Sequence, residues 1–360
     1  MKRLFGLAMP VVLLVFLFGF SPGSSFAAEM KPMTLRLAAV FPPPKVSLAS
    51  YAAQLFMDEV TKKTNGKIKF QPFWGGALGK PAEHLTAVEK GVADLALTHR
   101  WYTPGKLPLA QFEYVFPFGP TDPLIVVKAK RQIYEEFPQF KENLAKYNAL
   151  LLFSGPGCAY QILSKTPVQS LADFKGKKIS LIGRYFGRWV EPAGAVPVVA
   201  PAADRYTMLQ TGVTDMDFLP LDLFASYKIQ EQAPNLILVN ALTACWYDLM
   251  INTKTFAKFP KDVQDILIET GKEIELKMAK EGVPMWTKKV MAEFEKQGVK
   301  TFQFPEEERA KWSALVSDIP AEWAEEVTKQ GYPGWDIIAR YQQLTTEMGY
   351  KWPRKWGVKK

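Results

Sequence analysis

The feature that most constrains the fold is a regular alternation of strand and helix patterns in the first hundred residues. Apolar runs with strand character occur at 33–41, 67–74 and 93–101, and amphipathic helices are predicted at 47–66 and 82–92. This β-α-β-α-β order predicts a parallel sheet with helices on its faces. Ligands bind such sheets beyond the carboxyl ends of the strands. Those ends lie at 41–44, 74–79 and 98–101.

A second region of the chain repeats the alternation of strand and helix patterns. A proline-rich connector at 107–123 precedes it, and strand patterns resume at 149. The strand pattern at 245–253 is expected to lead back toward the first region. Helices fill the remainder, and Pro284 interrupts one long helical stretch at 261–298, which predicts a kink.

The amino terminus has the plan of a secretory signal peptide. Lys2 and Arg3 precede an apolar run at 4–20, and the small residues Ser25 and Ala27 form a cleavage pattern. We expect cleavage after residue 27, which leaves about 333 of the 360 residues, enough for two ordinary domains. A retained membrane anchor is the alternative. No later stretch reaches the ~18 uninterrupted apolar residues of a membrane span.

The charge distribution gives no support for a nucleic-acid partner. Loss of Lys2 and Arg3 lowers the formal net charge from +9 to +7, and the remaining basic residues are scattered among acidic ones. That pattern is typical of solvated helix surfaces. Only 351–360 is locally basic, which a frayed terminus explains.

Histidines and cysteines are too few and too scattered for a catalytic or metal site. We expect His84 to face solvent in mid-helix, and His99 to make neutral hydrogen bonds near the ligand region. No cluster has metal-ligand spacing and no phosphate-binding loop occurs, so we expect no enzyme activity, metal or cofactor.

Cys158 and Cys245 sit in apolar runs and are expected to be buried free thiols. In an exported protein, a disulfide between them is the alternative.

Several short motifs, in a fixed order, resemble one family. Individually each is weak, but together they are specific, and they run from about residue 34 to 270. The chain resembles the periplasmic solute-binding proteins of TRAP transporters, the DctP-type family. The matching stretches are TNGKIKFQPFWGGALG, AVEKGVADLAL, VFPF, SLADFKGKKI, GAVPV, YTMLQTGVTD and LMINTKTFAKFPKDVQDIL.

This resemblance implies a two-domain α/β clamshell with a ligand cleft, hinge strands and a long kinked helix. Each domain is expected to be a mainly parallel sheet flanked by helices. We expect a signal peptide at 1–27, domain I at 29–153 plus 247–282, and domain II at 154–246 plus 283–360 with the C-terminal helices. Closure around a ligand is a population shift between open and closed forms.

The resemblance also implies a function. The protein is expected in the periplasm as a monomer that captures an organic acid and delivers it to small and large membrane subunits of a TRAP transporter. An exported sensory module that presents its ligand to a membrane receptor is the alternative. A clamshell of the ABC or tripartite tricarboxylate type is a further one.

The expected carboxylate-binding arginine is missing. Members of the family carry Lys-x-Arg after the Gly-Lys-Lys-Ile strand, but Ser180 stands at that position here, and a hydroxyl lacks the charge and planar fork for bidentate recognition. Arg184, just past Gly183, is the nearest substitute, with Arg188 one turn further. Arg100, beyond the third strand, is another candidate. Either the clamp has moved to Arg184, or this pocket lacks the usual carboxylate grip.

Bulky residues gather where the cleft is expected. Family members often carry polar residues after the Gly-Val-x-Asp strand, whereas this chain has Phe218 and Leu219 there. Aromatic side chains supply large contact area, although any one of them can equally belong to the core. We therefore expect a solute bulkier or more aromatic than a C4-dicarboxylate. The candidate lining residues are Phe41, Trp74, Trp101, Tyr160, Met216, Phe218, Trp246 and Tyr247.

Overall fold

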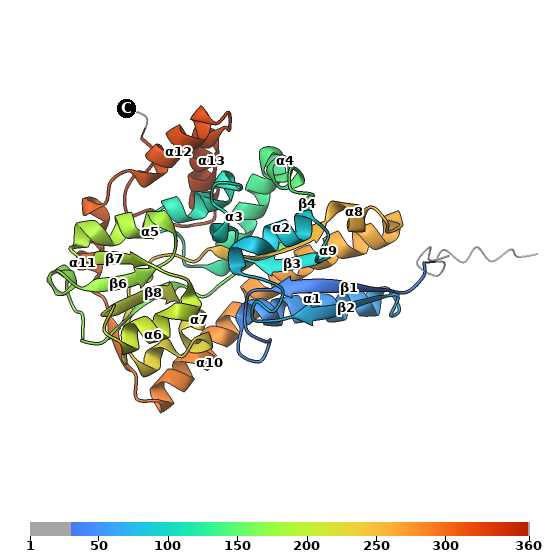
Figure 1. Cartoon of the computed structure of the whole chain (residues 1–360). Helices are drawn as coiled ribbons and strands as arrows, with labels where there is room; N and C mark the ends of the chain where they lie inside the picture. Colours follow the sequence, from blue (N-terminus) through green and yellow to red (C-terminus); the bar gives the residue numbers. More distant parts are fainter. Residues whose placement is uncertain (1–29, 359–360) are drawn as a thin grey trace, which may run out of the picture.

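The computed structural model describes residues 30–358, so the expected signal peptide lies outside the described residues. Figure 1 shows two lobes, each built around its own sheet. The sheet of lobe I has five strands in the order β2-β1-β3-β10-β4. Their bounds are β1 Met33–Ala39, β2 Ile68–Phe73, β3 Leu95–Thr98, β4 Ala149–Pro156 and β10 Cys245–Asn252.

The sheet of lobe II has six strands in the order β11-β9-β5-β8-β6-β7. In each sheet one strand runs against the others: β10 in lobe I and β5 in lobe II. The predicted α/β fold of mainly parallel sheets is therefore confirmed. The strand bounds are β5 Tyr160–Ser164, β6 Lys178–Leu181, β7 Val196–Val199, β8 Met216–Pro220, β9 Asn235–Leu238 and β11 Lys300–Gln303.

Helices cover the sheet of lobe I for reasons that are visible in their sequences. Helix α1 (Leu48–Lys63) begins at Ser47, whose hydroxyl accepts a hydrogen bond from the backbone N–H of Ser50, and it buries an apolar face. Helix α3 (Pro123–Glu136) begins at Asp122, whose carboxylate accepts from the N–H groups of Leu124 and Ile125. The other helices of this part are α2 His84–Glu89, α4 Gln139–Ala145 and α8 Thr253–Phe256.

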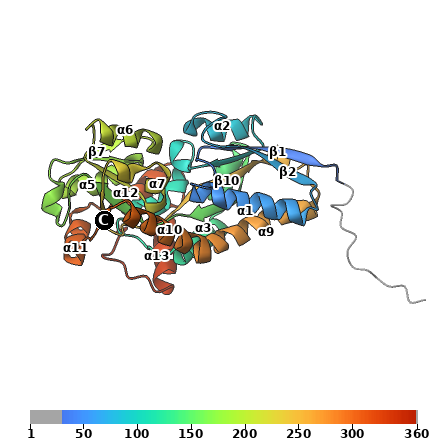
Figure 2. The same cartoon turned by 90° about the horizontal axis from the view of Figure 1, so that it is seen from below.

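One long helical rod joins the lobes. It consists of α9 (Lys261–Lys277), a π-helical turn (Met278–Gly282) and α10 (Val283–Lys296). Figure 2 shows α9 alongside α1 and α10 beside α7 (Leu221–Ser226), so the rod packs on both lobes. The irregularity expected at Pro284 takes the form of this wider turn, because proline has no N–H to give to the preceding turn.

The segment after β11 passes from one lobe to the other. Helix α11 (Glu306–Leu315) packs against lobe II, where the indole of Trp312 donates to the carbonyl of Trp189 at 2.6 Å. Helices α12 (Ile319–Lys329) and α13 (Gly334–Glu347) pack instead on the 3-10 turn η4 (Pro108–Val115) and on α3. The remaining helices of lobe II are α5 Gly183–Val190 and α6 Arg205–Gln210.

A continuous apolar core runs through both lobes, and it contains five fully buried tryptophans. Within residues 30–358, no helix combines the length and the hydropathy that crossing a bilayer requires.

Candidate functional site

An aromatic cluster fills the junction between the two lobes. Trp101, in the turn η3 (Arg100–Tyr102) after β3, stacks on Phe186 of α5 with ring centroids 5.2 Å apart. On the lobe II side, Tyr160 and Phe218 lie 5.5 Å apart, and on the lobe I side Trp246 contacts Phe41 at 5.1 Å. We call this set the junction cluster. Its members are Phe41, His99, Trp101, Tyr114, Tyr160, Phe186, Phe218, Trp246 and Tyr247.

The structure thus brings together most of the aromatic residues that the sequence singled out, all of them buried. Trp74 is different: it is only partly buried, and no ring contact joins it to the junction cluster within residues 30–358. Met216 is fully buried in β8, where its carbonyl accepts a hydrogen bond from the hydroxyl of Ser180.

Gly183 is a point of close contact between the lobes. It has a φ of +68°, and a Cβ placed there would lie 1.7 Å from Cζ3 of Trp101. Both the backbone conformation and the space require glycine. The strand exit that the sequence marked with Gly183 therefore receives an indole from the opposite lobe.

Four polar atoms at this junction have no hydrogen-bond partner among residues 30–358. They are Nε1 of Trp101, Nε1 of Trp246, the hydroxyl of Tyr247 and Oδ2 of Asp222. Buried polar groups in proteins are nearly always paired, and an unpaired one costs about 1–3 kcal/mol. Other unpaired buried atoms are spread over the molecule, but these four lie where a polar molecule bound between the lobes would pair with them.

His99 is held as a neutral ring within the cluster. Its Nδ1 accepts from the backbone N–H of Trp101 at 3.0 Å, and its Nε2 lies 3.2 Å from the hydroxyl of Tyr114. Desolvation, followed by the nearby charges of Arg100 and Lys130, holds the pKa of His99 well below its usual value. His99 therefore orients Trp101 and Tyr114.

Ser180, at the expected arginine position, is part of a buried network. Its hydroxyl donates to Oδ2 of Asp217 at 2.9 Å, and the other oxygen of Asp217 accepts from Nη1 of Arg205 at 2.9 Å. Arg205 also donates to the carbonyls of Ala200 and Phe218, and it is fully buried. Arg205 was not among the predicted site residues, because a lone arginine at the start of a short helix gives no sign that its side chain turns inward.

Arg184 and Arg188 extend from α5 to α12. Arg184 contacts Glu326 and donates to the hydroxyl of Tyr185 at 2.6 Å, and Arg188 lies 2.5 Å from Glu322. The side chain of Arg184 is 56% exposed, so it stands outside the junction cluster. It lines a separate cavity of about 210 Å³ together with Trp323 and residues 104–111.

Arg100 is buried beneath the sheet of lobe I. Its Nε lies 2.5 Å from Oδ2 of Asp248, and its other donors contact Tyr134 and Ser154. Lys130 pairs with Glu113 at 2.9 Å in the same region. All these charges are compensated within the protein. The partners of Arg100 on β4 and β10 occupy its guanidinium, so it is not free to bind a ligand.

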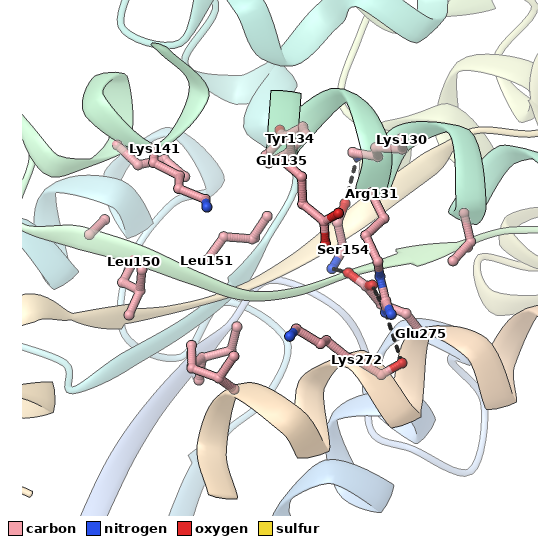
Figure 3. Close-up of a pocket in the computed structure, with 15 residues that line it drawn as sticks. Lys130, Arg131, Tyr134, Glu135, Lys141, Leu150, Leu151, Ser154, Lys272 and Glu275 are labelled. Atoms are coloured by element: carbon pink, nitrogen blue, oxygen red, sulfur yellow. Dashed lines mark hydrogen bonds and ion pairs between the residues drawn. The ribbon is translucent and has the colours of Figure 1, made fainter. Parts of the chain in front are cut away.

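A cavity of about 340 Å³ lies between α3, α4, β4 and α9. Figure 3 shows Lys141 and Lys272 pointing into it from opposite walls, and Arg131 paired with Glu275 at its inner end. None of the candidate ligand residues lines this cavity. It also lies along β4 rather than beyond the ends of the parallel strands.

Two expectations about other side chains are settled by the structure. His84 is fully buried, with Nε2 3.1 Å from the carbonyl of Gly79, so its predicted solvent-facing position is wrong: the helix begins at His84 and folds it back over the preceding loop. Cys158 and Cys245 are buried free thiols, as expected, and the disulfide alternative is wrong. Across residues 30–358 no group of His, Cys, Asp or Glu is arranged to hold a metal.

Comparison with known proteins identifies relatives of this chain. A protein of Albidiferax ferrireducens named solute-binding protein is 27% identical over 291 residues, which are 78% of this chain and 84% of the relative. A monocarboxylate 2-oxoacid-binding periplasmic protein of Nostoc is 24% identical over 268 residues, 71% of this chain and 70% of the relative.

Solved structures share the fold. An extracytoplasmic solute receptor of Bordetella pertussis that binds pyroglutamic acid matches with a TM-score of 0.75 and 18% identity, over 86% of this chain and 99% of that one. A TRAP periplasmic solute-binding protein of Rhodoferax ferrireducens with bound malonate matches with a TM-score of 0.73 and 25% identity, over 88% and 99%. These relatives are binding proteins of transporters and not enzymes.

The family model described as "Bacterial extracellular solute-binding protein, family 7" (DctP) matches residues 42–326. The match covers most of the chain and includes every strand except β1, every junction-cluster residue except Phe41, and the long helical rod. The chain therefore belongs to the bacterial extracellular solute-binding proteins of family 7.

Proposed function

We propose that this protein captures an organic acid between its two lobes and delivers it to the small and large membrane subunits of a TRAP transporter. The observation that carries the proposal is the set of four unpaired, buried polar atoms at the junction, three of them in the junction cluster and the fourth on Asp222. The cluster lies beyond the carboxyl ends of β3 and β8, where ligands bind to sheets of this kind.

The solute is proposed to be bulkier or more aromatic than a C4-dicarboxylate. Arg184, Arg188, Arg100 and Arg205 all have partners within the protein, and Ser180 replaces the expected arginine. The two carboxylates of a dicarboxylate would then find no unpaired arginine among these four. Aromatic side chains favour instead an apolar body, whose burial contributes about 25 cal/mol per Å².

The lobes are proposed to move as domains, with boundaries close to those expected from the sequence. The segments 29–153 plus 247–282 would form domain I, and 154–246 plus 283–315 would lie in domain II. The packing of α12 and α13 on η4 and α3 supports moving the last helices to domain I. Export by a signal peptide cleaved after residue 27, a periplasmic location and a monomeric state complete the proposal.

A thermal-shift screen of the purified protein tests this function. Phenylacetate, mandelate, benzoate and branched monocarboxylates are compared with succinate and malate. The proposal expects an aromatic or branched acid to raise the melting temperature. Stabilisation by succinate or malate alone would refute the proposed solute class, and no shift with any organic acid would refute the capture of organic acids.

A further inference from the structure

The unpaired oxygen of Asp222 is the most unusual of the four orphaned atoms. Asp222 is fully buried, and its Oδ1 accepts from the backbone N–H of Cys158 at 3.1 Å, whereas Oδ2 has no partner among residues 30–358. No ion pair with another of residues 30–358 compensates its charge, in contrast to the buried Asp217 and Asp248. A buried carboxylate left in this state is costly unless a donor reaches it.

The hydroxyl of Tyr247, from the other lobe, lies along the same short segment, 155–158. A Cβ at Gly155 would lie 2.5 Å from this hydroxyl, and the N–H of Cys158 is the one that Asp222 accepts. Asp222 follows the carboxyl end of β8 in lobe II, and Tyr247 belongs to β10, which pairs with β4 in lobe I. Tyr247 is fully buried, and its hydroxyl also lacks a partner. Burial, and after it the negative charge of Asp222, raises the pKa of Tyr247.

The surroundings of this pair connect it to the junction cluster. The ring of Tyr247 lies 5.0 Å from that of Trp246, whose Nε1 is itself unpaired. On the opposite side, the pKa of Tyr160 is raised by burial, with a smaller contribution from Asp222. Two glycines let the segment 155–157 approach these rings closely. A Cβ at Gly155 would overlap the ring of Tyr247, and one at Gly157 would overlap Trp246.

We propose that Asp222 and Tyr247 form a polar subsite that receives an O–H or N–H donor of the bound organic acid. The inference rests on the proposed function and narrows the solute class to acids with a second polar group, such as hydroxy acids, amino acids or lactam acids. Because the two side chains come from different lobes, a donor that bonds to both makes contacts that exist only when the lobes are closed. Such contacts are what drive closure.

Calorimetric titration with matched acids tests the subsite. Mandelate is compared with phenylacetate, which lacks only the hydroxyl, and pyroglutamate with 3-oxocyclopentanecarboxylate, which keeps the ring carbonyl and has CH₂ in place of the N–H. The first pair tests an O–H donor and the second an N–H donor. We expect the donor-bearing member of at least one pair to bind tenfold or more tightly, since a hydrogen bond to a charged group is worth about that factor.

Two isosteric variants locate the effect. Asp222→Asn keeps an acceptor for the N–H of Cys158 but turns its amide N–H₂ toward the donor, and Tyr247→Phe removes the hydroxyl. Both are expected to reduce the preference to less than threefold. Tyr206→Phe is the matched control, because Tyr206 lies outside the junction cluster and its hydroxyl donates to Glu231 at 3.1 Å. It is expected to leave the preference unchanged.

The outcomes separate the subsite from the proposed function. If acids bind but neither pair shows a preference, or if Asp222→Asn leaves the preference intact, a buried water alone occupies the place and the inference is overturned. If none of these four acids binds while other organic acids stabilise the protein, the subsite is also overturned and the function stands. If no organic acid binds at all, the proposed function fails first.

Discussion

At the residue scale, the molecule depends on a few buried groups whose partners lie far away in sequence. Asp222 is the clearest case, because burial raises its pKa from 3.8 to about 6 and hydrogen bonds from Cys158 lower it only in part. The groups that face it are the thiol of Cys158 and the phenols of Tyr160 and Tyr247. None of these carries a positive charge.

This raised pKa predicts a pH dependence of stability. Since the folded state holds the proton of Asp222 up to about pH 6 and the unfolded state loses it near pH 3.8, the ligand-free protein loses stability as pH rises through that window. The contribution amounts to about 3 kcal/mol. Urea unfolding between pH 4 and 7 should show a shallower fall in Asp222→Asn than in the wild type. Equal slopes would show that Asp222 is not the source.

The buried pair of Arg205 and Asp217 gives a second prediction at this scale. Both side chains are fully buried, so removing one leaves the other charge uncompensated. Arg205→Met is expected to lower the free energy of unfolding by about 3–5 kcal/mol, and Asp217→Leu similarly. The double variant should be clearly more stable than the sum of the two losses implies. Additive losses, measured by urea unfolding, would contradict this coupling.

At the scale of elements, α5 and α12 are joined by two parallel contacts across the lobes. Arg184 and Arg188 are one turn apart on α5, and they meet Glu326 and Glu322, also one turn apart on α12. Each pair is about half exposed, so together they should contribute no more than about 2 kcal/mol to closure.

Charge exchange tests this link between the helices. Reversing both arginines to glutamate is expected to weaken solute binding several-fold, and reversing both glutamates to arginine should do the same. The protein with all four reversals should recover, because attraction is restored. The effect should fade in 1 M salt, where exposed charges are screened. Equal affinities in all forms would show that the contacts do not assist closure.

The elements were also what the sequence predicted best. The strand and helix patterns at 33–101 and the strand pattern that resumes at 149 correspond to real strands and helices, because the periodic spacing of buried residues is a local property of the sequence. The long helix was predicted as well, although its irregularity became a π-helical turn before Pro284.

The site was less predictable, because it depends on which side chains meet across the junction. Trp101 and Phe218 were found from their places at strand ends, and the structure does place them in one cluster. Arg205 and Asp222 were not, since nothing local distinguishes an inward-facing charge from one on a solvated helix. The role of Arg184 likewise depends on Glu326, which is 142 residues away.

At the scale of the whole molecule, the two lobes are in contact in the described structure, with an indole of one lobe packed on a glycine of the other. Gly183→Ala should therefore hold the lobes apart, because its methyl group would occupy the space of Trp101. We expect a larger radius of gyration by small-angle X-ray scattering and solute affinity at least tenfold weaker. Gly212→Ala is the control: Gly212 also has a positive φ, but a Cβ there meets no atom. If the two variants have equal radii of gyration, the contact between Gly183 and Trp101 is not needed for the lobes to close.

The two buried thiols carry a chemical consequence for a protein that works outside the cytoplasm. Oxidants in that compartment attack thiolates, and burial raises the pKa of both Cys158 and Cys245 well above the usual value. Burial therefore protects these sulfurs from oxidation, as disulfide formation does in many exported proteins. Protection of the thiols from oxidation is then a second benefit of lobe closure. Cys158 would be exposed to oxidants only while the lobes are apart.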